Sequence, residues 1–408
     1  MLFNISLEKN IISPRLKPKI EVRLLEKKPR FVVEGTEISL RKAFDRKTLL
    51  LLGFAAIALT IYLYLGGVSI FSMIEIMLSA NPLILILGTA FTFVAILIDT
   101  LAWKILLRIS SITPSTSSVY RIQLASFSYG LLIPSAGAVE GIMRIALGTQ
   151  EFDNELEHRK ATSGEILSSV IAHKLCGLLA FITISVFVAF AILAYFNEIA
   201  ENMTGQSLSN EVAIAFVIII SLVSVLVIFF FILIAKAPNI AKMVMTYILR
   251  FFSYFPLIGT MATHSIEPSE KIIDDFSIQF TYLARNKFSS LIALILAFIS
   301  QIAHWISIFF ILTSLNGITI TLDQVAAVNF LGGTIDFLPV GIPGMAGLKE
   351  ITLSVFLDIG LGLGSTLAAS GAILVQLMKF YFIIVVGLVV YVAGKSRITS
   401  NDLNEKDI

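Results

Sequence analysis

Long apolar stretches, nearly free of charged residues, recur along this sequence. They lie near residues 48–66, 82–107, 166–195, 212–235, 288–313 and 366–392. Each is long enough to cross a bilayer, whose hydrocarbon core needs about 20 apolar residues per helix. Only 14% of the residues are charged and 57% are hydrophobic, and a soluble fold of this size has too little interior to bury that excess. The sequence therefore predicts an all-α polytopic membrane protein.

Two further apolar regions, 119–147 and 322–363, are interrupted by proline and glycine. The interruptions contain Pro134, Gly137, Pro339, Pro343, Gly344 and Gly347. Proline and glycine free backbone groups that lipid cannot satisfy, so such breaks survive only inside protein or beside water. We expect two broken or re-entrant segments, which brings the total to about eight membrane segments. The alternative is a pair of ordinary kinked helices that are packed for stability.

The distribution of lysine and arginine predicts the orientation. The N-terminal tail (1–47), the stretch 236–287 and the C-terminal tail (394–408) contain lysine and arginine, whereas 67–82 and 196–211 contain no Lys or Arg. By the positive-inside rule, both tails are cytoplasmic in a multi-pass cell-membrane protein. The two broken regions must then enter from opposite faces, as in an inverted-repeat transporter. Within 238–285 the pattern favours helices lying on the cytosolic surface, either as plain connectors or in contact with headgroups.

Ionisable residues at membrane depth are the candidate substrate-binding residues. They are Glu140, Arg144, Asp336, Lys349, Glu350 and Lys379. Each costs about 2.5–3.5 kcal/mol at the bilayer centre on insertion scales, so such residues usually face a partner or a cavity. We expect Arg144, Glu350 and Lys379 to converge on one polar site that holds an anionic group such as phosphate.

Several ionisable residues of the apolar stretches can also be explained without a substrate. Glu140 and Arg144 are four residues apart and can pair on one helix face. Asp99 and Lys104, near a helix end, are expected to snorkel to the interface. His304 and Asp358 are expected to have packing or interfacial roles, and His173 and Lys174 are assigned no role.

Signatures of catalysis and of metal binding are missing. The four histidines are far apart and form no HExxH pair, and the single cysteine, Cys176, lies in an apolar run. There is no GxSxG elbow and no P-loop. We therefore expect no catalytic residue, no metal, no cofactor and no nucleic-acid partner, and we do not expect an enzyme.

Two motifs carry a family resemblance. The segment LIPSAGAVEGIMR (132–144) is followed much later by LPVGIPGMAGLKE (338–350), and Trp103-Lys104 ends the second stretch. Together they resemble the lysylphosphatidylglycerol synthase transmembrane region family, also called flippase-like membrane proteins, over about residues 48–393. Where the family usually has a Glu-Arg pair, this chain has His173-Lys174.

The resemblance implies translocation of a lipid, either an aminoacylated phospholipid or a polyprenyl-phosphate-linked sugar. Residues 394–408 are too few for the soluble transferase domain of the bifunctional synthases, so lysine transfer is not expected and a separate lipid-modifying transferase is the expected partner. The predicted function is transport of an anionic lipid or lipid-linked headgroup through a polar site between the two broken helices. The alternatives are a secondary transporter of a soluble anion and, less favoured, a membrane-embedded enzyme acting on a lipid-linked substrate.

Overall fold

The chain is described by a computed structural model, and its described part is helical. The described residues are 30–33, 36–39, 46–132, 138–154, 158–204, 237–253, 273–274, 286–334 and 345–404, with single positions between 222 and 236. Two short antiparallel hairpins accompany the helices. They pair β1 (Arg30–Val33) with β2 (Thr36–Ser39), and β3 (Asp153–Asn154) with β4 (Arg159–Lys160). The prediction of an all-α protein is confirmed.

Four described helices are long and apolar enough to cross a membrane. They are α4 (Pro82–Ile109), the first part of α7 (Ser163–Thr204), α12 (Lys287–Thr313), and the run of α15 (Ser365–Gln376), η4 (Leu377–Tyr381) and α16 (Phe382–Asn404) up to Ala393. A fifth candidate is a bent pair in which α2 (Arg46–Leu65) and α3 (Ile70–Leu78) meet at 95°. The predicted span 212–235 lies largely outside the described residues. A multi-pass membrane protein is therefore confirmed at this level.

Both regions that the sequence marks as broken consist of separate helices. The first contains α5 (Thr116–Leu132) and α6 (Ala138–Glu151). The second contains α13 (Leu322–Thr334), α14 (Leu348–Val355) and the π-helix η3 (Phe356–Gly360). Pro134, Gly137, Asp336, Pro339, Pro343 and Gly344 lie outside the described residues.

Gly347 has a backbone conformation that explains its residue type. Its φ is +83°, and a Cβ there would lie 2.8 Å from the carbonyl oxygen of Ala55 on α2. Glycine alone combines this conformation with such a close approach. Gly347 also caps α14, because its N–H donates to Glu350 Oε2 at 2.7 Å.

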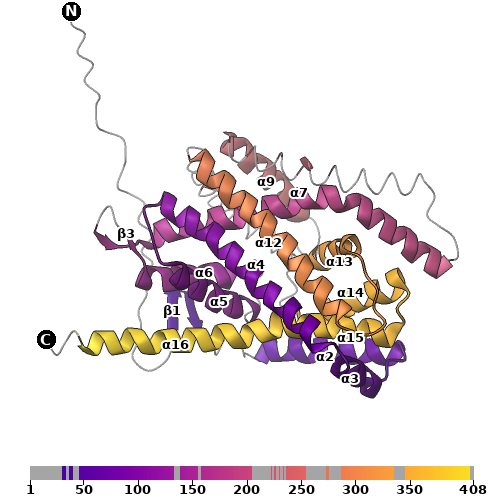
Figure 1. Cartoon of the computed structure of the whole chain (residues 1–408). Helices are drawn as coiled ribbons and strands as arrows, with labels where there is room; N and C mark the ends of the chain where they lie inside the picture. Colours follow the sequence, from indigo (N-terminus) through magenta and orange to yellow (C-terminus); the bar gives the residue numbers. More distant parts are fainter. Residues whose placement is uncertain are drawn as a thin grey trace, which may run out of the picture.

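Small residues hold the helices together at short distances, as is typical inside membranes. Helices α4 and α12 lie side by side (Figure 1). A Cβ at Gly88 of α4 would lie 2.9 Å from the backbone nitrogen of Ile311 on α12. One turn further along, Thr92 Oγ1 and Ser307 Oγ are hydrogen-bonded at 2.6 Å. The pair is therefore fixed by backbone proximity and hydroxyl bonds.

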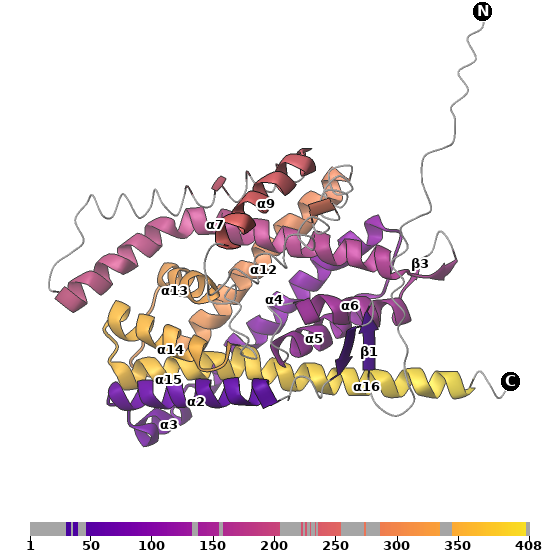
Figure 2. The ribbon, with the colours of Figure 1, turned by 180° about the vertical axis from the view of Figure 1, so that it is seen from behind.

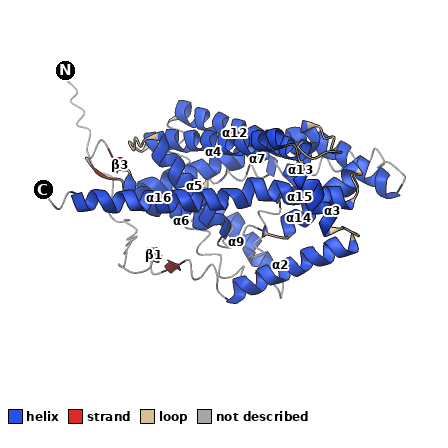
Figure 3. Ribbon diagram, turned by 60° about the horizontal axis from the view of Figure 1, so that its bottom comes forward, coloured by secondary structure: helices blue, strands red, loops and turns tan. Residues whose placement is uncertain are grey.

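A glycine and a hydroxyl group also join α16 to α5 at short distance. A Cβ at Gly387 would lie 2.0 Å from Ser128 Oγ, and Ser128 donates to the carbonyl oxygen of Ile383 at 3.1 Å. Helix α16 runs along one side of the molecule in continuation of α15 (Figure 2). From below, it passes beside α5 and α6, whereas α2 lies further out (Figure 3). Contacts of α5 with α6 and of α6 with α7 complete the part of the fold that carries the candidate site.

The outer faces of these helices expose large apolar side chains. Leu83 on α4, Phe288 on α12 and Val389 on α16 are 77%, 76% and 62% exposed. Such surfaces are stable against lipid and unfavourable in water. Helix α9 (Pro238–Ser253), part of the predicted interfacial stretch, likewise exposes an apolar face that includes Tyr247 and Phe251.

Candidate functional site

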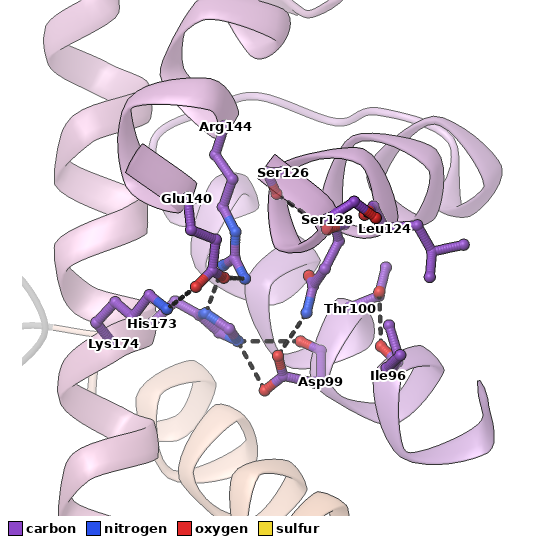
Figure 4. A network of polar contacts seen from close by, with 11 residues as sticks. Ile96, Asp99, Thr100, Leu124, Ser126, Ser128, Glu140, Arg144, His173 and Lys174 are labelled. Atoms are coloured by element: carbon purple, nitrogen blue, oxygen red, sulfur yellow. Dashed lines mark hydrogen bonds and ion pairs between the residues drawn. The ribbon is translucent and has the colours of Figure 1, made fainter. Parts of the chain in front are cut away.

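Six polar side chains from four helices form a connected network in the first half of the chain. We call them the Arg144 cluster: Asp99 of α4, Gln123 of α5, Glu140 and Arg144 of α6, and His173 and Lys174 of α7. Arg144 forms an ion pair with Glu140, so the predicted i,i+4 pair is confirmed. Lys174 Nζ contacts the other oxygen of Glu140 at 2.5 Å (Figure 4). Glu140 therefore has two cationic partners.

His173 connects Arg144 to Asp99. Its Nδ1 lies 2.9 Å from Arg144 Nη1. Its Nε2 lies 3.0 Å from Asp99 Oδ1 and 3.1 Å from the carbonyl oxygen of Asp99 (Figure 4). Gln123 Nε2 donates to the second carboxylate oxygen of Asp99. The network thus runs from Gln123 to Lys174 without interruption.

The centre of the network is buried inside the protein, whereas Lys174 is exposed. Arg144, His173 and Glu140 are only 1%, 4% and 7% exposed. The guanidinium carbon of Arg144 lies 5.0 Å from the ring centroid of Trp103, which is fully buried and donates from Nε1 to Ser169 Oγ at 3.0 Å. A buried charge needs such partners, because removal from water costs several kcal/mol per ion.

Two buried polar atoms of the Arg144 cluster have no hydrogen-bond partner among the described residues. They are the donor Arg144 Nε and the acceptor Gln123 Oε1. Most buried polar atoms in proteins are satisfied by protein or by water. A bound polar group could supply the two missing bonds.

The structure corrects the interpretation of Asp99. The expectation that Asp99 snorkels to the interface is wrong, because its carboxylate accepts hydrogen bonds from His173 and Gln123. These partners come from α7 and α5, and no local pattern in the sequence indicates them. The available signal was the insertion cost itself, since ionisable residues on apolar helices must find partners. Lys104 donates to Thr116 Oγ1 at 2.7 Å, near the end of α4.

The remaining described candidates form a second group, the Lys349 cluster. It contains Asn329 of α13, Lys349 and Glu350 of α14, and Lys379, Phe380 and Tyr381 of η4. The ammonium nitrogens of Lys349 and Lys379 lie 4.1 and 5.6 Å from the ring centroid of Phe380. Lys379 also donates to Asn329 Oδ1 at 3.5 Å. Both ammonium groups therefore lie within cation–π distance of the same aromatic ring.

Glu350 is fully engaged by neutral donors. One oxygen accepts from the N–H of Gly347 at 2.7 Å, and the other accepts from the hydroxyl of Tyr381 at 2.6 Å. Glu350 and Lys349 are 5% and 7% exposed. The π-helix η4 supplies Lys379, Phe380 and Tyr381 in succession, and π-helical turns are frequent at functional sites.

The structure places Arg144, Glu350 and Lys379 in two clusters, and their convergence on a single polar site stays a prediction. Glu350 and Lys379 belong to the Lys349 cluster, and Arg144 belongs to the other. His304 of α12 lies close enough to feel the charges of both Asp99 and Lys379. Its Nδ1 is buried without a partner in the part of the chain that the structure describes. The sequence assigned His304 only a packing or interfacial role.

The chemistry of the two clusters suits binding of an anionic group. Guanidinium and ammonium groups bind phosphate and carboxylate through charge-assisted hydrogen bonds. Among the described residues, no group of three His, Cys, Asp or Glu side chains is placed to hold a metal ion. Cys176 is buried, as expected for a small apolar side chain.

Comparison with known proteins identifies the family. The family model described as "Lysylphosphatidylglycerol synthase TM region" matches residues 50–387. No curated protein and no solved structure gives a significant match. The matched region contains both clusters and every candidate span except the end of the last one, which runs to Ala393. The chain belongs to the lysylphosphatidylglycerol synthase transmembrane region family, the flippase-like membrane proteins.

Proposed function

We propose that this protein is a flippase-like transporter that moves the anionic headgroup of a lipid across the membrane. The observation that carries the proposal is the pair of lysines at Phe380, in the interior of a membrane protein. An anionic group near the ring would be attracted to both Lys349 and Lys379. Arg144, whose guanidinium lies over the Trp103 ring, offers a third cation in the Arg144 cluster.

The family favours a lipid over a soluble anion as the substrate. Its name refers to lysylphosphatidylglycerol, an aminoacylated phospholipid. A lipid can keep its acyl chains against the exposed apolar faces of α4 and α12 while its headgroup binds the cations of the two clusters. The polyprenyl phosphates share this design, with a phosphate on an apolar chain. A soluble anion gains nothing from such faces.

The architecture that we propose has about eight membrane segments, two of them broken, related as an inverted repeat. Both termini lie in the cytoplasm. The protein performs no chemistry itself, and a separate transferase modifies the lipid. Thiol labelling tests the orientation, because the native Cys176 is buried. Ser72→Cys and Asn316→Cys should react with an impermeant reagent from outside, whereas Ser39→Cys should not.

The transport proposal is tested in liposomes that contain fluorescent NBD-phosphatidylglycerol. Dithionite bleaches the outer leaflet, so loss of the protected inner-leaflet signal measures translocation. Lys379→Met removes one charge-assisted contact worth about 1.5–3 kcal/mol, so translocation should slow about 10- to 100-fold. Lys160→Met is the matched control, because Lys160 is exposed on β4 and its ion-pair partner Asp153 is exposed as well.

The same proteoliposomes separate the alternatives. Uptake of radiolabelled inorganic phosphate without movement of NBD-phosphatidylglycerol would favour a transporter of soluble anions. A new lipid product detected by mass spectrometry would favour a membrane enzyme. If Lys379→Met moves the fluorescent lipid as fast as Lys160→Met, the Lys349 cluster is not the binding site.

A further inference from the structure

The protonation state of His173 follows from its neighbours. A guanidinium can only donate hydrogen bonds, so His173 Nδ1, at 2.9 Å from Arg144 Nη1, must be the acceptor. A carbonyl oxygen can only accept, so His173 Nε2, at 3.1 Å from the carbonyl oxygen of Asp99, must carry the hydrogen. Both arguments give the same neutral tautomer, with the proton on Nε2. In this state His173 helps to hold Arg144.

Protonation of His173 would reverse its relation to Arg144. A second N–H at Nδ1 would point at the guanidinium N–H, which replaces a hydrogen bond by a contact between two cations. The attraction to the Asp99 carboxylate, 3.0 Å from Nε2, would become stronger at the same time. Asp99 therefore favours the proton and Arg144 opposes it.

An anionic headgroup would change this balance. Once a phosphate engages Arg144, its negative charge offsets the guanidinium that opposes protonation of His173. Conversely, a proton on His173 frees Arg144 to turn toward a ligand. Binding of the proton and binding of the anion must then strengthen each other by the same factor.

We propose that His173 is a proton-binding site coupled to anion binding at Arg144, so that the coupling ion of this transporter is the proton. The inference rests on the proposed function, since it needs an anionic headgroup at Arg144. A headgroup and a proton that bind together carry no net charge through the low-dielectric interior. That combination avoids the cost of moving an isolated anion.

The charged groups around His173 are those of the Arg144 cluster. Helix α4 contributes Asp99, α6 contributes Glu140 and Arg144, and α7 itself contributes Lys174. Helix α12 contributes His304, which lies within electrostatic reach of Asp99. The acidic residues of the other described helices that pack on α7 do not belong to the surroundings of His173. Asp323 is exposed at the start of α13, and Asp358 of η3 lies near Tyr62.

The first experiment measures binding of NBD-phosphatidylglycerol to the purified full-length protein in phosphatidylcholine nanodiscs between pH 7.5 and 5.5, the range in which an ordinary histidine titrates, at about 6.5. The phosphodiester of the probe stays ionised throughout. For the wild type, affinity should rise as the pH falls, by up to about tenfold per pH unit if one proton is coupled. His173→Gln keeps a donor for Asp99 but cannot titrate, so its affinity should be independent of pH.

Two control variants make the result specific. His158→Gln changes an exposed histidine in the β3–β4 turn and should retain the wild-type pH dependence. If His304→Gln abolishes the pH dependence while His173→Gln retains it, the inference is overturned. If His173→Gln keeps the wild-type pH dependence, the inference fails and the proposed function stands. A wild type that binds the anionic probe no better than NBD-phosphatidylcholine would overturn both.

The second experiment observes the proton directly. In protein labelled with ¹⁵N-histidine, the signal that disappears in His173→Gln belongs to His173. At pH 7.5 it should show a protonated Nε2 and an unprotonated Nδ1. A wild-type His173 with its proton on Nδ1 would overturn the inference without any lipid.

Discussion

Glu140→Leu tests whether the Arg144 cluster stabilises the fold as the contacts indicate. The substitution removes the acid from both cations and leaves Arg144 charged at 1% exposure. Loss of one partner of a buried ion pair costs about 3–5 kcal/mol. The side chain of Lys174 is 48% exposed, so water replaces its lost contact and that part is worth about 0–1 kcal/mol. Nearly all of the expected loss in the free energy of unfolding therefore comes from Arg144.

The assay is unfolding in mixed micelles of SDS and a mild detergent, followed by tryptophan fluorescence. Trp103 is a local probe, because its ring lies against Arg144. Glu140→Leu combined with Arg144→Met removes both charges, and the double variant should regain most of the loss. The control is Glu151→Leu, whose partner Arg121 is 33% exposed, and it should cost less than about 1 kcal/mol. A double variant as unstable as the sum of the two single variants would refute the reasoning.

Three further predictions concern the close contacts of the fold, each measured by the same unfolding assay. Gly387→Ala should lower the free energy of unfolding by at least about 1–3 kcal/mol, because its Cβ would lie 2.0 Å from Ser128 Oγ and 2.4 Å from the carbonyl oxygen of Leu124; an unchanged midpoint would show that α5 and α16 separate easily. Gly347→Ala should cost about 1–2 kcal/mol for its φ of +83°, before the clash with α2 is added. Trp103→Phe loses the hydrogen bond to Ser169 and part of the ring under Arg144, so the free energy of unfolding should fall by about 1–2 kcal/mol. A stability equal to that of the wild type would contradict the role given to the indole.

Much of the helical framework could be predicted, because a helix that crosses a bilayer needs a long apolar stretch with few charged residues. The apolar stretches 82–107 and 288–313 correspond to α4 and α12 within a few residues. The break near Gly347 was visible as a cluster of proline and glycine. The bend of 95° between α2 and α3 was not predicted. It falls at Gly66-Gly67, where no proline marks a break and the flanking residues remain apolar.

The candidate site was predictable only where its contacts are local. The pairing of Glu140 with Arg144 follows from a spacing of four residues on one helix. The contacts of His173 with Asp99 join residues 74 positions apart, and only the packing of α7 on α4 creates them. The hydrogen bond from the N–H of Gly347 to Glu350 joins residues three positions apart and is local. The hydrogen bond from Tyr381 to Glu350 depends on tertiary packing. Sequence analysis found the charges that need partners but could not say which charges meet.

The arrangement around Glu140 explains how a buried ion pair can still exchange partners. Were Arg144 to leave Glu140 for a phosphate, an acid with a single partner would be stranded in the protein, at several kcal/mol. Glu140 has two partners, and Lys174 Nζ lies 2.5 Å from the carboxylate oxygen that Arg144 does not contact, so this contact does not depend on Arg144. The second cation therefore lowers the cost of releasing the first, and Lys174→Met should weaken binding of NBD-phosphatidylglycerol even though Lys174 itself need not touch the lipid. Lys160→Met is the matched control, and equal affinities of the two variants would show that Lys174 has no part in the exchange.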